Sequence, residues 1–99
     1  MIQVVLPAPL CELAKLEKAL IFLEVPEPLT FDSMLTVLEK QYPALKGKIR
    51  DAQTGERRPM VRLFACERDY SHQPLETALP QDVIEGLSPV LVVGAIAGG

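Results

Sequence analysis

The chain has 99 residues, of which 48% are hydrophobic and 23% are charged, and its formal net charge is −3. This length and composition fit one globular domain and exclude a disordered chain. The densest basic cluster is the pair Arg57 and Arg58, which excludes the electrostatic footprint of a nucleic-acid-binding protein. The apolar runs fall far short of the roughly 20 residues that cross a bilayer, and no basic region precedes the first run. We therefore expect a cytoplasmic protein that does not bind membranes.

Cysteine and histidine are scarce: the chain has Cys11, Cys66 and one histidine, His72. A zinc site needs about four Cys, His or carboxylate ligands at patterned spacing, and that pattern is absent, so we expect no metal site. Two reduced thiols fit a cytoplasmic protein, with a disulfide or a sulfur relay as the alternatives. His72 has no base or nucleophile arranged around it, which predicts a solvated loop histidine.

The first quarter of the chain predicts two strands. Residues 2–6 are apolar and largely β-branched, and Pro7 stops them, which predicts the first strand. Residues 10–18 predict a helical turn or an ordered loop. Residues 19–25 predict a second strand, closed by Pro26, because the run is too short for an ordinary helix.

The strongest helix signal follows Thr30, a preferred N-cap residue, with Asp32 in the first turn. Pro43 predicts that this helix ends near Tyr42 and that a short turn continues through Leu45. Apolar residues at helical spacing form one face: Phe31, Met34, Leu35, Leu38, Tyr42, Leu45 and Ile49.

The second half of the chain predicts shorter elements. Residues 51–59 are polar and predict an exposed loop, and residues 60–66 predict a third strand. Residues 75–79 predict a short fourth strand, and residues 81–86 predict a turn with 3₁₀ character. Residues 90–93 predict the last strand.

This order of elements predicts an α+β fold, a mixed sheet of four to five strands with one main helix packed across it. The most apolar strands, the first and the last, would lie side by side in parallel at the centre. The sequence shows no repeat and no linker, so residues 1–93 form one domain and residues 94–99 form a C-terminal tail.

The tail is the most informative segment. A terminal pair of glycines arises by chance in roughly one chain in 200. Glycine lacks Cβ, so such a tail is thin enough to be threaded into a deep active site of a partner. The pattern predicts that the Gly99 carboxylate is the reactive group, and the alternative is a frayed terminus. The tail consists of Gly94, Ala95, Ile96, Ala97, Gly98 and Gly99.

These features resemble the β-grasp, ubiquitin-like sulfur carriers of the MoaD/ThiS type, which include the small subunit of molybdopterin synthase. Leu10, Glu12, Leu13 and Ala14 resemble the family's LRELA loop. Thr30 and the helix to Tyr42 and Pro43 resemble its T-v-x-x-L-L helix. Arg58-Pro59 followed by Arg62-Leu63-Phe64 resembles the run into its third strand, and Ala95-Ile96-Ala97-Gly98-Gly99 is similar to its AVAGG ending.

The chain departs from the family pattern at three points. Cys66-Glu67-Arg68-Asp69 stands where the family often has an Asn-Gly hairpin turn. Gly94 stands where a proline often precedes the AVAGG ending, and the chain is longer than a typical member in its second half. These departures leave the β-grasp prediction unchanged and bear on which carrier the chain is.

The resemblance implies a chemistry for the tail. An activating enzyme uses Mg-ATP to adenylate Gly99, and a sulfur donor protein converts the acyl-adenylate to a thiocarboxylate. The chain itself binds no cofactor, since it has no phosphate loop. It would act as the small subunit or co-substrate of a molybdopterin synthase and insert its tail into the large subunit, rather than as a catalyst alone.

Other functions stay open at this point. The chain could carry sulfur to another sulfur-accepting enzyme, for thiazole, tRNA thiolation or cysteine synthesis. It could be a ubiquitin-like modifier that is joined to lysines through Gly99, or a β-grasp binding module with an inert tail.

A docking face for the partner is the last prediction. Phe64, Leu91 and Val92 are candidates for an exposed apolar sheet face, although they would equally fit the core, because a one-residue register change swaps the two faces. The run Glu67, Arg68 and Asp69 predicts a solvated turn rather than an acid–base pair. Arg57 and Arg58 likewise predict a solvated loop rather than an anion site.

Overall fold

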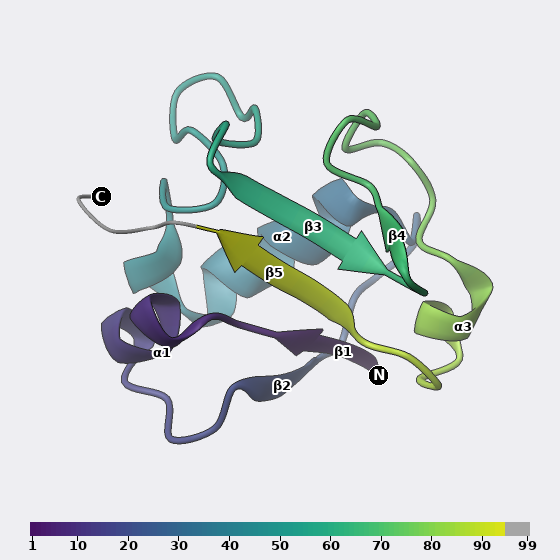
Figure 1. Ribbon diagram of the computed structural model, residues 1–99, viewed down its shortest axis with the longest axis horizontal. Helices are drawn as coiled ribbons and strands as arrows, with labels where there is room; N and C mark the ends of the chain where they lie inside the picture. Colours follow the sequence, from purple (N-terminus) through teal and green to yellow (C-terminus); the bar gives the residue numbers. More distant parts are fainter. Residues whose placement is uncertain (95–99) are drawn as a thin grey trace.

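The computed structural model describes residues 1–94, which form a five-stranded mixed sheet with one long helix across one of its faces (Figure 1). The strand order is β2-β1-β5-β3-β4, and the central pair, β1 and β5, is parallel. The predicted α+β β-grasp architecture and the parallel central pair are therefore confirmed. The strands are β1 (Ile2–Val5), β2 (Leu20–Leu23), β3 (Val61–Ala65), β4 (Arg68–Asp69) and β5 (Val90–Gly94).

The long helix α2 (Phe31–Gln41) begins where the sequence predicts. The Thr30 hydroxyl oxygen accepts a hydrogen bond from the Ser33 backbone N–H at 3.1 Å, which satisfies one of the amides that every helix leaves free at its start. The helix ends before Pro43, whose ring cannot continue it. A 3₁₀ turn, η1 (Pro43–Leu45), follows as expected.

The core lies between α2 and the sheet face that this helix covers. In β1, β2, β3 and β5 every second side chain points to this face and is buried, as the two-residue period of a strand requires, whereas both residues of β4 are exposed. Burial of these side chains supplies the main driving force for folding, at roughly 25 cal/mol per Å² of apolar surface. The largest buried side chains are Phe31, Leu6, Leu10, Leu23, Met34, Leu35, Leu38, Leu45, Ile49 and Leu63.

The helix α1 (Ala8–Ala14) replaces the turn or loop predicted over residues 10–18. It starts at once after Pro7, its N-cap, and carries a second proline in its first turn. Proline is tolerated there, since the first helical N–H groups have no partner within the helix. Lys15, in the left-handed region at φ 57°, ends the helix.

The predicted strand over residues 75–79 is wrong. This segment meets the start of α2 instead: the carbonyl oxygens of Leu75 and Thr77 accept the N–H groups of Asp32 and Phe31, at 2.8 and 3.2 Å. Leu75 and Glu76 form a turn, and of this segment only Ala78 makes a bridge, an isolated one to Thr30. The carbonyls of the turn therefore satisfy the free amides of a helix instead of forming a strand ladder. The fourth strand is β4, directly after β3, and the last helix α3 (Gln81–Ile84) occupies the predicted turn at residues 81–86.

Within residues 1–94, no helix is both long and apolar enough to cross a membrane. In the same range, no three Cys, His or carboxylate side chains lie together as metal ligands would. Cys11 and Cys66 are both free thiols.

Candidate functional site at the end of strand β5

The five residues predicted to form most of the reactive tail, Ala95, Ile96, Ala97, Gly98 and Gly99, lie outside the described residues. The last described residue is Gly94, which we predicted from the sequence to belong to the tail. Gly94 is instead the last residue of β5 and pairs with Val61 of β3, so the strand runs one residue further than predicted. The point from which the tail departs is thus defined.

Gly94 is required by the geometry of this point. Its φ is +155°, which L side chains rarely adopt, and a Cβ built on it would overlap the carbonyl oxygen of Met60 and lie 3.0 Å from the Val61 Cα. Proline, which the family often has here, holds φ near −65° and would need another backbone path. The departure at Gly94 is therefore a consequence of how closely β5 approaches the start of β3.

The segment that Gly94 approaches is held by Arg57. Its Nε donates to the Ser71 carbonyl at 2.8 Å, and its Nη1 donates to the carbonyls of Arg58, at 2.9 Å, and Val61. Arg58 in turn donates to the Gly47 carbonyl. The prediction of a solvated loop for these two arginines is wrong, because their guanidinium groups bind backbone carbonyls and fix the entry into β3.

The candidate docking residues fall on both faces of the sheet. Phe64 pairs with Leu91 across β3 and β5, and both point away from α2. Leu91 is 38% exposed and Phe64 is half-buried, whereas Val92 is only 2% exposed. Val92 therefore belongs to the core and cannot line a docking face, because neighbouring residues of a strand point to opposite faces.

An apolar row crosses this open face. Leu20, Val5, Leu91 and Phe64 are successive partners across β2, β1, β5 and β3. Other apolar side chains flank the row, among them Val93, which is 44% exposed. At the β3 end of the row a hollow of about 300 Å³ opens, lined in part by Phe64, Leu91, Cys66 and Pro89. Exposed apolar surface of this kind is typical of a binding face.

The three residues predicted to form a solvated turn, Glu67, Arg68 and Asp69, are exposed, but only Glu67 lies in the turn of the hairpin. Cys66 and Glu67 form the two-residue turn, at φ 51° and 64°, and the next two residues form β4. Two positive φ values are the signature of the tight hairpin that Asn-Gly usually makes. The hairpin thus stands where the family has one, with a different sequence.

Asp69 ties this hairpin together. Its carboxylate accepts from the Ser71 N–H at 2.8 Å and from Arg62 Nη1 at 2.9 Å. Hydrogen bonding by Ser71, with a smaller contribution from Arg62, holds the pKa of Asp69 below its ordinary value of 3.8. The Ser71 hydroxyl oxygen also accepts the Leu63 N–H at 2.9 Å, so a side chain extends the ladder where β4 has ended.

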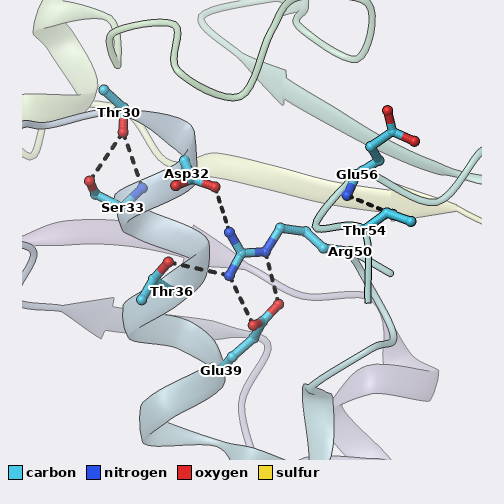
Figure 2. Close-up of polar contacts among 8 residues, drawn as sticks. All are labelled: Thr30, Asp32, Ser33, Thr36, Glu39, Arg50, Thr54 and Glu56. Atoms are coloured by element: carbon cyan, nitrogen blue, oxygen red, sulfur yellow. Dashed lines mark hydrogen bonds and ion pairs between the residues drawn. The ribbon is translucent and has the colours of Figure 1, made fainter. Parts of the chain in front are cut away.

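A second polar network lies on the opposite, helix-covered side, and sequence reasoning missed it (Figure 2). Arg50 binds Glu39 through Nη2 at 2.9 Å and Nε at 3.1 Å, and binds Asp32 through Nη1 at 2.6 Å. The hydrogen bond to Glu39 is the main cause that raises the pKa of Arg50 above its ordinary value. The spacing of Asp32 and Glu39, about two helical turns, was the available signal.

Neither His72 nor Cys11 belongs to a catalytic arrangement of the described residues. His72 is exposed in the turn after β4. The Cys11 thiol donates to the Leu6 carbonyl at 3.5 Å.

No protein-family profile and no curated protein matches the sequence. Solved structures do match, over nearly the whole chain. The small archaeal modifier protein 1 (SAMP1) of Haloferax volcanii aligns with a TM-score of 0.72 and 18% identity, over 98% of this chain and 97% of that one. A chain of the BexX/CysO complex of Amycolatopsis orientalis aligns with a TM-score of 0.75 and 13% identity, over 100% of both. This chain has the ubiquitin-like β-grasp fold.

A third structure, the HVO 2177 protein of Haloferax volcanii, aligns with a TM-score of 0.68 and 26% identity, over 99% of this chain and 87% of that one. The resemblance inferred from the sequence is thereby confirmed at the level of the fold. In this ubiquitin-like fold the described site consists of two parts, the strand end at Gly94 and the apolar row on the open face.

Proposed function

We propose that this chain is a sulfur carrier whose Gly99 carboxylate is adenylated and then converted to a thiocarboxylate. The observation that carries the proposal is the position of β5. This central strand ends at Gly94, and residues 95–99, with the glycine pair Gly98 and Gly99, follow it directly. The ubiquitin-like carrier and modifier fold supports a carrier or modifier role.

The chemistry needs an activating enzyme. A carboxylate becomes electrophilic when its oxygen attacks the α-phosphorus of ATP and pyrophosphate leaves. A sulfide equivalent from a sulfur donor protein then attacks the acyl carbon, and AMP leaves. The activating enzyme supplies Mg²⁺ and the cationic groups that stabilise phosphoryl charge, since this sequence contains no phosphate loop. The chain binds no cofactor itself and acts as a co-substrate.

The two parts of the described site have separate roles in this proposal. The apolar row on the open face docks the adenylating, ubiquitin-activating-like enzyme, because it is the exposed apolar surface nearest to β5. Gly94 sets the direction in which the tail leaves the sheet, since its backbone lies against Met60. The narrow residues Ala95 and Ala97 let the tail follow a channel to the reactive centre.

We further propose that the acceptor is the large subunit of a molybdopterin synthase, a function that rests on the family resemblance in the sequence. Carriers for thiazole, tRNA thiolation or cysteine synthesis share the fold and the tail. One of the similar structures is a two-protein complex, which supports the expectation of a stable partner. Capture of the partner from native cells distinguishes these cases, because each acceptor enzyme has a different identity.

A second function has a specific observation in its favour. SAMP1, similar to this chain over nearly its whole length, is named a small archaeal modifier. A modifier would be joined through Gly99 to lysines of other proteins, and the same tail and docking face would serve. Isopeptide adducts of Gly99 on other proteins would identify this role, whereas a thiocarboxylate would identify the carrier.

The threading of the tail is tested by Gly98→Val. We expect this variant to fold normally and to lose ATP–pyrophosphate exchange with the activating enzyme from native cells, because a branched side chain would collide with the channel. Ala52→Val, in an exposed loop, adds similar bulk away from the tail and should react normally. Normal exchange by Gly98→Val would exclude threading through a narrow channel.

A further inference from the structure

Strand β2 is an edge strand, and among residues 1–94 its outer side has no strand partner. The N–H of Leu6 donates to the Ala19 carbonyl at 3.0 Å, next to the β1–β2 ladder. Bonded and non-bonded pairs alternate in an antiparallel ladder, so Ala19, Ile21 and Leu23 direct their backbone groups toward β1. The N–H and C=O groups of Leu20 therefore point outward, as do those of Phe22.

The outward edge is also apolar. Leu20 is 40% exposed and Phe22 is 52% exposed, and both lie on the open face of the sheet. Neither a proline nor a charged residue interrupts β2 itself. Natural proteins usually protect such an edge by charge, proline or a covering element, because free backbone groups pair readily with another strand.

We propose that two copies of this chain pair through β2. The two strands run antiparallel about a two-fold axis, with Ile21 opposite Ile21 of the partner subunit. Leu20 of one copy then forms a hydrogen-bonded pair with Phe22 of the partner subunit, and each such pair has two backbone hydrogen bonds. The two-fold axis repeats the pair, so the outward groups form four backbone hydrogen bonds across the interface. Two five-stranded sheets become one continuous sheet.

Charge complementarity selects this occupant and this register. With Ile21 on the axis, Lys18 stands opposite Glu24 of the partner subunit, and the symmetry gives the same pair again. Both side chains are exposed; Glu24 directly follows β2, and Lys18 precedes it by two residues, with a bend at Ala19 between them. Opposite charges across strands stabilise a pair, and an apolar side chain opposite a charge does not.

Neighbouring registers lack this match. Outward backbone groups recur at every second residue, so the nearest alternative registers are shifted by two residues in either direction along the edge. One such shift places Lys18 opposite Phe22 of the partner subunit, and the other places Glu24 opposite Leu20 of the partner subunit. The edge is therefore self-complementary in one register, which a random partner strand would not reproduce.

The proposed dimer leaves the strand that carries the tail free and shares only Leu20 with the apolar row. β1 separates β2 from β5, so the pairing uses neither Gly94 nor the strand from which the tail departs. The interface consists of one short strand per copy, which is typical of weak association. We expect a dissociation constant between about 1 µM and 1 mM.

Analytical sedimentation of the full chain at protein concentrations from about 1 µM to 1 mM tests the proposal. The wild type should shift from monomer to dimer, and amide hydrogen exchange at Leu20 and Phe22 should slow as the dimer forms. Lys18→Glu places like charges at both ends of the pairing and should raise the dissociation constant about tenfold. Glu24→Lys should do the same. Lys40→Glu, an exposed change of the same charge on α2, should have no effect.

Mixing the variants makes the test specific for the register. In a mixture of Lys18→Glu and Glu24→Lys, opposite charges face each other at both ends, so association should return as a heterodimer. The double variant should again form a homodimer. Failure of both recoveries, or a wild type that stays monomeric over the whole range, would overturn the proposal. A monomeric wild type would show that Lys18 and Glu24 protect the edge instead of pairing it.

Discussion

The two faces of the sheet are built from the same strands and have opposite properties. The face under α2 consists of side chains that are almost fully buried, such as Leu63 and Val92, at 1% and 2% exposure. The open face carries their immediate neighbours, Phe64 and Leu91, which pair with each other and remain accessible. One residue along a strand thus separates a position that holds the fold together from one that is available to a partner.

This contrast assigns different consequences to substitutions on the two faces. Removal of a buried side chain leaves a cavity and lowers the free energy of unfolding. Removal of an accessible side chain leaves the core intact, so its effect should appear in binding. Matched substitutions at neighbouring positions on the two faces should therefore separate stability from binding.

Leu63→Ala should lower the free energy of unfolding by about 2 to 5 kcal/mol, because Leu63 is fully packed in the core. Leu91→Ala should lower it by less than about 1 kcal/mol and should instead weaken activation of the tail by the adenylating enzyme. Urea denaturation gives the first quantity and pyrophosphate exchange the second. Equal losses of stability in the two variants would contradict the division between the faces.

Gly94→Ala should lower the free energy of unfolding by about 1 to 3 kcal/mol, since the new Cβ would push β5 away from Met60. The matched control is Gly55→Ala. Gly55 also has a positive φ, at +77°, but no neighbouring atom lies within 4 Å of an added Cβ. The control should cost only about 1 kcal/mol. Denaturation of both variants, with hydrogen exchange at Val61, separates the effect of the steric overlap with Met60 from the effect of the positive φ. An equal loss of stability in both variants would show that the overlap is unimportant.

Arg50→Met should lower the free energy of unfolding by about 1 to 3 kcal/mol, because it leaves Glu39 without its charged hydrogen-bond partner. Lys46→Met, at an exposed position nearby, should change stability little. Both variants should be activated at the wild-type rate, since the network lies on the helix-covered side. Slow activation of Arg50→Met in a folded protein would show that this side also takes part in recognition.

The smallest expected effect is the loss of stability at acidic pH. Hydrogen bonds depress the pKa of Asp69, and those from Thr54 and Gln53 depress the pKa of Asp51, both from 3.8. A carboxyl with a depressed folded pKa stabilises the protein fully above its unfolded pKa, and this stabilisation is lost as pH falls through the lower folded value. Stability should therefore fall as pH drops below about 3.8.

Asp69→Asn should flatten this acid dependence, and Asp51→Asn should flatten a further part. Urea denaturation at a series of pH values measures both. An unchanged slope in Asp69→Asn would show that its contacts with Ser71 and Arg62 do not stabilise the hairpin.

Much of this architecture can be predicted from the sequence, because helix and strand positions depend on local patterns of residues. The apolar period and the cap at Thr30 define α2, and the apolar runs define the two central strands. The sheet face toward which a side chain points cannot be predicted from local sequence. Leu91 points outward because Val90 is paired with Val4 in the core, and only the register between distant strands decides this.

The errors arise where tertiary hydrogen bonds or a tight turn override what the local residue types predict. The segment at residues 75–79 has strand-like composition, yet its carbonyls receive the free amides of α2. Arg57 looks solvated in sequence, yet it binds the carbonyls that bring the chain into β3. Cys66 and Glu67 adopt a turn that favours Asn-Gly, and no propensity of these residues indicates it.

The most direct test of the account is the intact mass of this protein purified from its native cells. The account predicts a population ending at Gly99 and heavier by about 16 Da, the exchange of one carboxylate oxygen for sulfur, which disappears when Gly98 and Gly99 are deleted. Protein of unmodified mass under all growth conditions, with no adducts through Gly99 on other proteins, would contradict it.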